Sequence, residues 1–175
     1  DSEMLYLEKY PSLNKEIFEK IKSLYTKAVQ EANNTDFAGA VKLAMDDKIR
    51  IKTAIDEYAK NAANEIPILF YDSTLLSSGK TGLILTDKNI YLGEFMTHHT
   101  IPLRSVLSIV PQKAAFAINE ISLTGVNLTK ETSPFFVDLL KNIIELLIDG
   151  SEQAAIEDNK NNKTKEIEKR KELEL

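Results

Sequence analysis

The residues with the clearest chemical potential are Gly79-Lys80-Thr81, at the entrance to an apolar run. A glycine followed by a lysine and a hydroxyl residue is typical of loops that bind the phosphates of nucleotides. Such a loop needs a further glycine five positions before the second one, and Thr74 stands there. A phosphate loop also leads into a helix whose N-terminus holds the anion, whereas Lys80 leads into an expected strand. The spacing therefore argues against nucleotide binding.

His98 and His99 are the other candidates for chemistry, and they are the only histidines. Adjacent residues on a strand point to opposite faces, so the two cannot easily grip one metal ion. The chain has no cysteine that could complete a metal site. No nucleophile elbow or marked carboxylate pair accompanies the histidines. We therefore expect the histidines to be exposed loop or strand-edge residues. We also expect no catalytic residue, no metal, no cofactor, and a protein that is not an enzyme.

The composition limits the partners. A formal net charge of −5 argues against bulk attraction to nucleic acid or anionic lipid. No apolar run approaches the roughly 18 to 20 residues that a membrane-spanning helix needs. The absence of cysteine fits a reducing cytosol, and it also fits a cysteine-free exported protein. We expect a cytoplasmic protein. Because the chain starts at Asp1 rather than methionine, we also expect it to be a piece of a longer protein, whose missing part could carry a membrane anchor.

Residues 1–64 show helical periodicity and no strand signal. Asn33-Asn34-Thr35-Asp36 forms a polar break rich in helix-capping residues. The region is therefore expected to be a helical hairpin or a three-helix unit. One apolar stripe before the break consists of Ile17, Phe18, Ile21, Leu24, Tyr25, Ala28 and Val29. Helices this short gain most of their stability from packing, so their apolar stripes must be buried.

The character of the chain changes after Ile66, where β-branched and aromatic residues stand in short runs between turn residues. Strands are predicted at 67–71, 83–86, 90–95, 98–101, 106–111, 114–118 and 121–127. Thr86-Asp87-Lys88-Asn89 and Asn119-Glu120 supply hairpin turns. Pro102 and Pro111 are expected at strand ends or on an edge, because proline cannot donate to a ladder. Short strands with tight connections predict a sandwich or an open barrel.

A strongly apolar helix is predicted at 134–149, with Ser133 as its cap and Gly150 as its stop. Its polar stripe is narrow, so one sheet cannot cover the apolar remainder. The N-terminal helices or a second copy of the protein would supply the second cover. The candidate contact residues on this helix are Phe135, Leu139, Ile143, Leu146 and Leu147. Residues 151–175 are charge-dense and are expected to form a solvated helix or a disordered tail.

Two segments resemble bacterial pleckstrin-homology-like (PH-like) and GRAM-like domains. The first is Leu69 to Tyr91, which ends in the hairpin Gly82-Leu-Ile-Leu-Thr-Asp-Lys-Asn-Ile-Tyr91. The second is Ile101-Pro-Leu-Arg-Ser-Val-Leu-Ser-Ile109. The resemblance covers about residues 66–149. It implies a seven-stranded PH-like open barrel or sandwich with its capping helix at 65–150. The helical region 1–64 lies outside the resemblance, and the two parts together predict an α+β fold.

The resemblance further implies a non-enzymatic binding or scaffold module that acts through protein–protein contacts and self-associates. The alternative is a peripheral membrane-surface or lipid-binding module. PH domains that bind phosphoinositides place several cations in the loop between the first two strands, and here Asp72 to Gly82 offers only Lys80. This departure argues against headgroup binding, because phosphate recognition needs clustered cations. We expect no nucleic-acid partner, because no basic stripe interleaved with aromatic residues is present.

Overall fold

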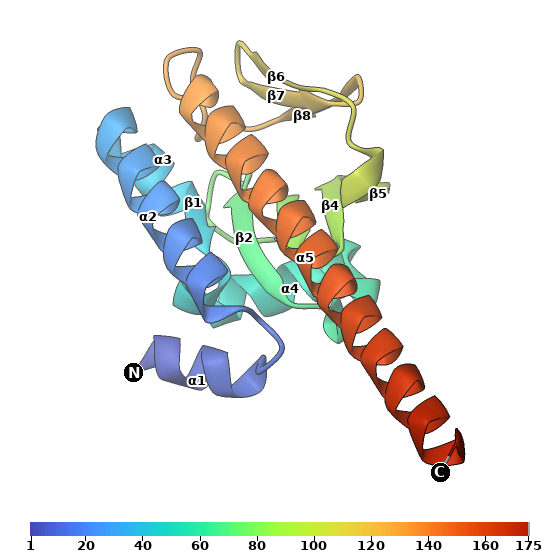
Figure 1. Ribbon diagram of the computed structural model, residues 1–175. Helices are drawn as coiled ribbons and strands as arrows, with labels where there is room; N and C mark the ends of the chain where they lie inside the picture. Colours follow the sequence, from blue (N-terminus) through green and yellow to red (C-terminus); the bar gives the residue numbers. More distant parts are fainter. Residues whose placement is uncertain (175) are drawn as a thin grey trace.

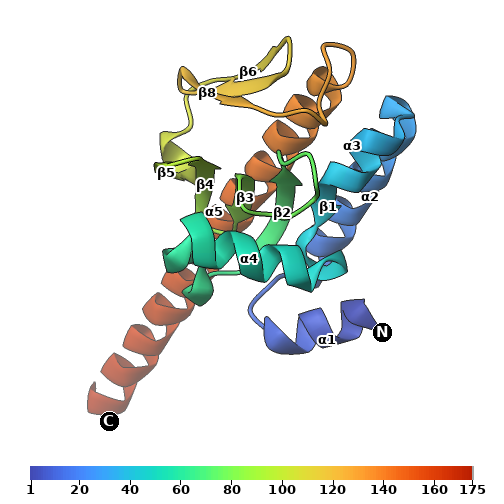
Figure 2. The same cartoon turned by 180° about the vertical axis from the view of Figure 1, so that it is seen from behind.

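The computed structural model describes residues 1–174 and has a mixed α+β architecture. Figure 1 shows a long C-terminal helix, α5 (Ser133–Glu174), lying over a five-stranded sheet, with a three-stranded sheet at one end. Helix α2 (Lys15–Ala32) runs alongside α5, and α4 (Lys48–Tyr58) covers the opposite face of the larger sheet (Figure 2). The α+β class is confirmed. The two antiparallel sheets are not closed into a barrel.

The N-terminal region consists mostly of short helices with side-chain caps. It contains α1 (Ser2–Lys9), α2, α3 (Thr35–Ala40), η1 (Ala44–Asp46), α4 and η2 (Lys60–Asn64). Asn14, Asn34 and Asp47 cap α2, α3 and α4 by accepting backbone N–H bonds, which satisfies otherwise unpaired donors. The prediction that this region has no strand is wrong. Strand β1 (Val41–Leu43) pairs antiparallel with β2, and three residues are too few to produce a visible alternation in the sequence.

The larger sheet has the order β1-β2-β3-β4-β5, and the smaller one has the order β6-β7-β8. Their bounds are β2 (Pro67–Asp72), β3 (Gly82–Thr86), β4 (Asn89–Glu94), β5 (Thr97–Pro102), β6 (Ile109–Gln112), β7 (Ala115–Ile118) and β8 (Ile121–Thr124), with η3 (Leu103–Ser105) between β5 and β6. The seven expected strands are therefore present after residue 65. Both expected hairpin turns are confirmed, with Asn119 and Glu120 at φ 49° and 69°. Pro102 ends β5, and Pro111 lies on the edge strand β6.

Two strand boundaries differ from the sequence prediction for identifiable reasons. The strand expected from 106 starts at Ile109, because the backbone N–H groups of Leu107 and Ser108 donate to the Asn119 side chain instead of to a strand. The strand expected to reach Asn127 ends at Thr124, because the Asn127 amide donates to carbonyl oxygens near the end of β2. Side-chain hydrogen bonds thus replace ladder bonds at both places.

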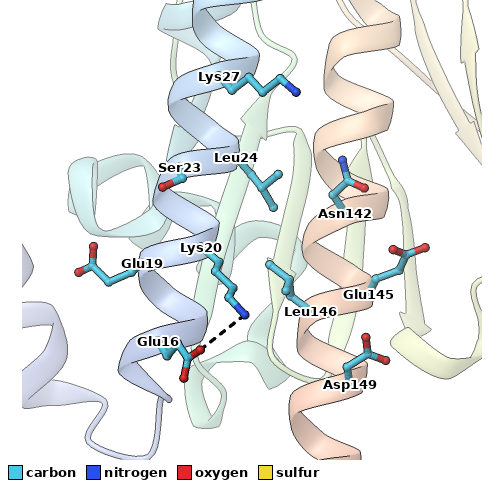
Figure 3. A pocket seen from close by; sticks show the side chains of 10 residues that line it. All are labelled: Glu16, Glu19, Lys20, Ser23, Leu24, Lys27, Asn142, Glu145, Leu146 and Asp149. Atoms are coloured by element: carbon cyan, nitrogen blue, oxygen red, sulfur yellow. Dashed lines mark ion pairs between the residues drawn. The ribbon is translucent and has the colours of Figure 1, made fainter.

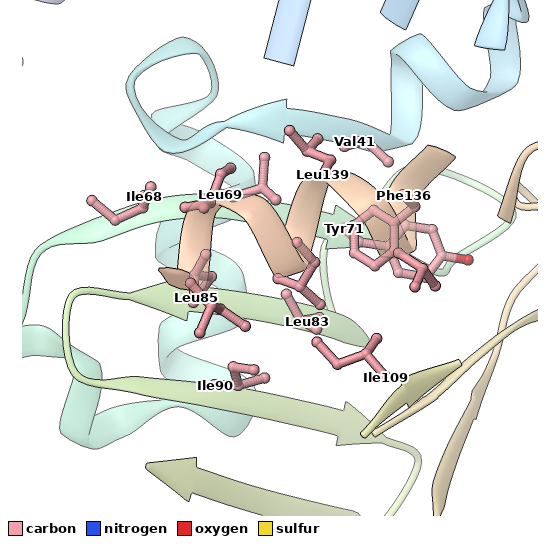
Figure 4. Packing of buried hydrophobic residues seen from close by; sticks show 14 of the residues in the cluster. Val41, Ile68, Leu69, Tyr71, Leu83, Leu85, Ile90, Ile109, Phe136 and Leu139 are labelled. Carbon is pink, nitrogen blue, oxygen red and sulfur yellow. The ribbon is translucent and has the colours of Figure 1, made fainter. Parts of the chain in front are cut away.

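The larger sheet is buried on both faces, which explains the continuous burial of β2 and β3. On one face Leu69, Leu83 and Leu85 pack under α5 (Figure 4). On the other face Phe70 and Ile84 pack against α4, since alternate residues of a strand point to opposite sides. The N-terminal helices therefore pack with the strands in two hydrophobic clusters, one on each face of the larger sheet.

Helix α5 begins where the sequence predicts and ends much later. Gly150 was expected to stop it, yet the helix continues for 42 residues in all. A Cβ at Gly150 would clash with the side chain of Ile17, so this glycine permits α2 and α5 to approach closely. Ser133 is fully buried inside the first turn, and its hydroxyl donates to the carbonyl oxygen of Ala115 rather than capping the helix. Residues 151–174 are helical and exposed, which is the solvated helix of the two forms expected for this charged segment.

Candidate binding surface

The residues expected to contact a partner on α5 lie mostly inside the protein. Leu139, Ile143 and Leu147 are 2%, 0% and 8% exposed, while Phe135 and Leu146 are partly buried. Helix α2 supplies the second cover, and the core includes residues of α2, α5 and the larger sheet. Three of the five positions therefore leave no surface for a partner. A contact through the other two stays a prediction.

Exposed apolar side chains gather elsewhere, at one end of the two sheets. We call this the loop end, and it consists of the connections 73–81, 95–96, 113–114 and 125–132. Hydrogen bonds hold these connections together. The Asn127 side chain donates to the carbonyl oxygens of Asp72 and Thr74, at 3.1 and 3.0 Å. The backbone N–H groups of Thr124 and Gly125 reach Glu94 Oε1 at 3.3 Å and the Ala114 carbonyl at 3.1 Å.

The loop between β2 and β3 is shaped by the carboxylate of Asp72, which is fully buried. One carboxylate oxygen accepts from the N–H and the hydroxyl of Thr74, at 2.9 and 2.6 Å. The other accepts from Gly79 N–H at 3.0 Å and pairs with Arg50 Nη1 at 3.0 Å. A Cβ at Gly79 would lie 2.9 Å from the Arg50 carbonyl oxygen, and its φ is 76°. Gly79 therefore closes a tight loop, which is a structural role rather than phosphate binding.

Arg50 fastens this loop to the N-terminal region. Its Nε donates to Asp47 Oδ2 at 2.7 Å, its Nη2 donates to the Gly39 carbonyl at 2.8 Å, and its guanidinium stacks 5.0 Å from the centre of the Phe70 ring. Burial alone would lower the pKa of Arg50, but its hydrogen bonds to Asp47 and Asp72 raise that pKa above its ordinary value. The ion pair is thus satisfied on both sides, as a buried charge requires.

The loop end presents five large apolar side chains to solvent. Their exposed fractions are 77% for Leu75, 87% for Leu76, 86% for Phe95, 86% for Met96 and 57% for Val126. We call these residues the apolar tips. They come from three separate connections, and the hydrogen bonds of Asp72 and Asn127 hold the connection that carries both leucines. Several exposed apolar residues in one place are uncommon on a soluble surface and mark interaction sites.

The hairpin Phe95-Met96 breaks the usual rules of turn chemistry. A two-residue hairpin favours Asn-Gly, because positive φ angles suit those residues. Here Met96 has φ 64°, a left-handed conformation that costs a non-glycine residue about 1 kcal/mol. Both side chains are also almost fully exposed, so neither the turn nor the core accounts for them. Local rules of this kind are broken most often at functional positions.

The charges around the apolar tips differ from those of the whole chain. Lys80, Lys113 and Lys130 are exposed at the loop end, against Glu94 and Glu131. The Glu94 carboxylate also accepts a hydrogen bond from the Thr124 N–H, which holds this side chain against β8. The loop end thus carries a small positive excess although the chain has a formal net charge of −5.

The histidines lie on β5, which is an edge strand, as predicted. His98 is exposed and its ring lies 6.4 Å from that of Tyr58. Within residues 1–174, no group of three or more His, Cys, Asp or Glu side chains is placed to hold a metal ion. In the same range, no helix combines the length and apolar character needed to cross a membrane.

The sequence contained a signal for the apolar tips. Leu75-Leu76 and Phe95-Met96 are adjacent apolar pairs inside segments that read as turns, where polar residues are the norm. Their meeting at one end depends on strand order. Strand β2 ends where β3 begins and where β4 ends, so the two pairs share an end. The pairing of Asp72 with Arg50, 22 residues away, has no local signature.

Comparisons of this chain with protein-family models, with curated proteins and with solved structures found no match.

Proposed function

We propose that the chain is a non-enzymatic binding module of PH-like architecture that docks on a membrane surface through its loop end. The observation that carries the proposal is the location of five exposed apolar side chains on three connections at the same end of the sheets. The PH-like class is supported by the Gly82–Tyr91 hairpin motif and by the order of seven strands followed by a helix. This proposal favours the membrane-surface alternative, because the helix expected to bind a protein partner is largely covered within the chain.

The form of the apolar tips favours a bilayer over a folded protein partner. The tips project from separate turns, and a fluid bilayer can receive projecting side chains without a complementary surface. The lysines Lys80, Lys113 and Lys130 add about 1 kcal/mol each near an anionic membrane. Positive charge and exposed apolar side chains therefore coincide at the loop end.

The apolar tips are large enough to matter energetically. Complete burial of a leucine, phenylalanine or methionine side chain is worth about 1.5–3 kcal/mol. Partial insertion of each tip at about 1 kcal/mol, together with the lysines, would give a reversible membrane affinity. Serine at both Leu75 and Leu76 would then remove about 2 kcal/mol or more, which lowers vesicle binding about 30-fold.

Vesicle co-sedimentation tests the proposal. The wild-type chain should pellet with phosphatidylcholine vesicles that contain phosphatidylserine, and less with phosphatidylcholine alone. Leu75→Ser/Leu76→Ser should remain in the supernatant. The matched control is Leu107→Ser, since Leu107 is 89% exposed but precedes β6, at the opposite end of the smaller sheet from the loop end. A wild-type chain that stays in the supernatant with both kinds of vesicle, or equal pelleting of all three proteins, would overturn the proposal.

A further inference from the structure

The exposed part of α5 carries two charge blocks of opposite sign. Between Asn142 and Asn159 the helix has five acidic residues and no basic one: Glu145, Asp149, Glu152, Glu157 and Asp158. We call these the acidic block. From 160 to 171 it has six basic residues and two acidic ones, the basic ones being Lys160, Lys163, Lys165, Lys169, Arg170 and Lys171. We call these six the basic block. Such a helix is complementary to an antiparallel copy of itself.

A groove runs between α2 and α5 beside the acidic block (Figure 3). Its volume is about 680 Å³, and its ten lining residues include Leu24 and Leu146, whose side chains point toward one another. Glu145 and Asp149 line it on the α5 side. Neither of them takes part in an ion pair among residues 1–174. The groove therefore offers an apolar strip with an acidic border on its α5 side, while its α2 side carries both acidic residues and the lysines Lys20 and Lys27.

The basic block lies on a helix that extends away from the rest of the protein (Figures 1 and 2). Residues 151–174 are exposed throughout, including Ile156 at 47% and Ile167 at 53%. Ile167 follows Leu146 by 21 residues, which leaves the two about 60° apart around a straight α-helix of 3.6 residues per turn, so both lie within one broad face of α5. Residues 151–174 therefore form a projecting helical segment about 36 Å long, in which Ile167 lies among the residues of the basic block.

We infer that two copies of this chain associate with their α5 helices antiparallel, each placing its basic block along the α2–α5 groove of the other. In this arrangement the second copy's Ile167 lies beside Leu146, and Ile156 of each copy lies near the two-fold axis. The acidic block of each copy faces the basic block of the other. The interface is isologous, so one complementary pair of surfaces is used twice and the assembly closes as a dimer.

The two α5 helices overlap along both charge blocks, so each acidic block meets a basic block of the other copy. This favours a second copy over an unrelated helix as the occupant of the groove. Residues 142–171 of each chain take part, which is about 45 Å of helix. The apolar contribution is small, so association rests on electrostatic complementarity and should weaken as salt screens the charges. The loop end is not involved, and the inference stands independently of membrane docking.

Charge reversal followed by mixing tests the inference. Sedimentation velocity should show a concentration-dependent dimer for the wild-type chain at low salt. Lys163→Glu/Lys169→Glu/Arg170→Glu, and separately Glu145→Lys/Asp149→Lys, should each weaken self-association at least tenfold. An equimolar mixture of the two variants should restore the dimer, because both contacts of the mixed pair then join opposite charges. All these side chains are exposed, and circular dichroism should confirm an unchanged helix content.

A distance measurement distinguishes this dimer from a parallel one. The chain has no cysteine, so Lys171→Cys provides a single site for a spin label. Antiparallel helices that cross near Ile156 place the two labels about 45 Å apart, whereas a parallel pair places them about 10 Å apart. A strict monomer at every concentration, a dimer unaffected by either reversal, a mixture that fails to reassociate, or labels at the short distance would each overturn the inference.

Discussion

Replacing Asp72 with alanine removes the group that shapes the β2–β3 loop, and its cost can be worked out from the structure. The carboxylate is fully buried, accepts three hydrogen bonds from Thr74 and Gly79, and pairs with Arg50 at 3.0 Å. Removal of one partner of a buried pair costs about 3–5 kcal/mol, because the other charge is left unpaired. Arg50 retains Asp47 as a partner, so we expect the lower end, about 3 kcal/mol.

Urea unfolding at neutral pH measures this cost, and hydrogen exchange locates it. Asp72→Ala should lower the free energy of unfolding by about 3 kcal/mol and should speed exchange at the Thr74 and Gly79 amides. The matched control is Asp56→Ala, because Asp56 is an exposed aspartate on α4, and its effect should stay within about 0.5 kcal/mol. A double-mutant cycle with Arg50→Met should show a coupling of about 1 kcal/mol or more.

The same substitution links the loop to the proposed function. Leu75 and Leu76 remain in Asp72→Ala, but the loop that presents them loses its fixed shape, so vesicle binding should fall several-fold while the protein is still folded. A loss of stability below about 1 kcal/mol, with unchanged exchange at the loop amides, would show that this carboxylate does not organise the loop.

Three further predictions concern single positions. Met96→Gly should raise the free energy of unfolding by about 0.5–1 kcal/mol, because Met96 has φ 64°, and should weaken vesicle binding; a destabilised variant in thermal unfolding contradicts the first expectation. Ile143→Ala should cost about 2–5 kcal/mol in urea unfolding, since Ile143 is 0% exposed, and a loss below about 1 kcal/mol would contradict its place in the core. Burial, followed by the charge of Asp46, raises the pKa of Tyr25 to about 12, so the stability held by its neutral form is present below pH 10 and is lost as the pH rises toward 12. The free energy of unfolding of Tyr25→Phe should therefore fall less steeply between pH 10 and 12 than that of the wild type. Equal slopes for the two proteins would show that Tyr25 does not cause this loss of stability.

The elements that the sequence predicts well are those with local signals. The Thr86–Asn89 and Asn119-Glu120 turns were readable, because turn residues between two apolar runs specify a hairpin. The start of the helix near Ser133 was readable as well, although Ser133 makes a tertiary hydrogen bond instead of capping. Local rules failed at Gly150. Glycine is typical of a helix stop, yet α5 continues through this residue, which lies against the Ile17 side chain of α2.

The binding surface was only partly readable for the same reason. The sequence correctly predicted that the last helix has more apolar surface than one sheet can cover. It left two candidates for the second cover, the N-terminal helices and a second copy of the protein. It could not show that Ile143 is completely buried, in a cluster that also contains residues of α2. Conversely, Leu75 and Phe95 stood in predicted turns, and only the strand order brings them to one end. Composition identified the apolar residues, whereas topology decided which of them remain exposed.

Docking of the loop end on a membrane can be followed by the fluorescence of a single tryptophan. The chain has no tryptophan, so Phe95→Trp introduces a single reporter at an apolar tip. Leu107→Trp places the same reporter at an equally exposed position before β6. On addition of phosphatidylserine-containing vesicles, the emission of Phe95→Trp should shift to the blue and that of Leu107→Trp should not. Unshifted emission from both reporters, or an equal shift from both, would contradict the account.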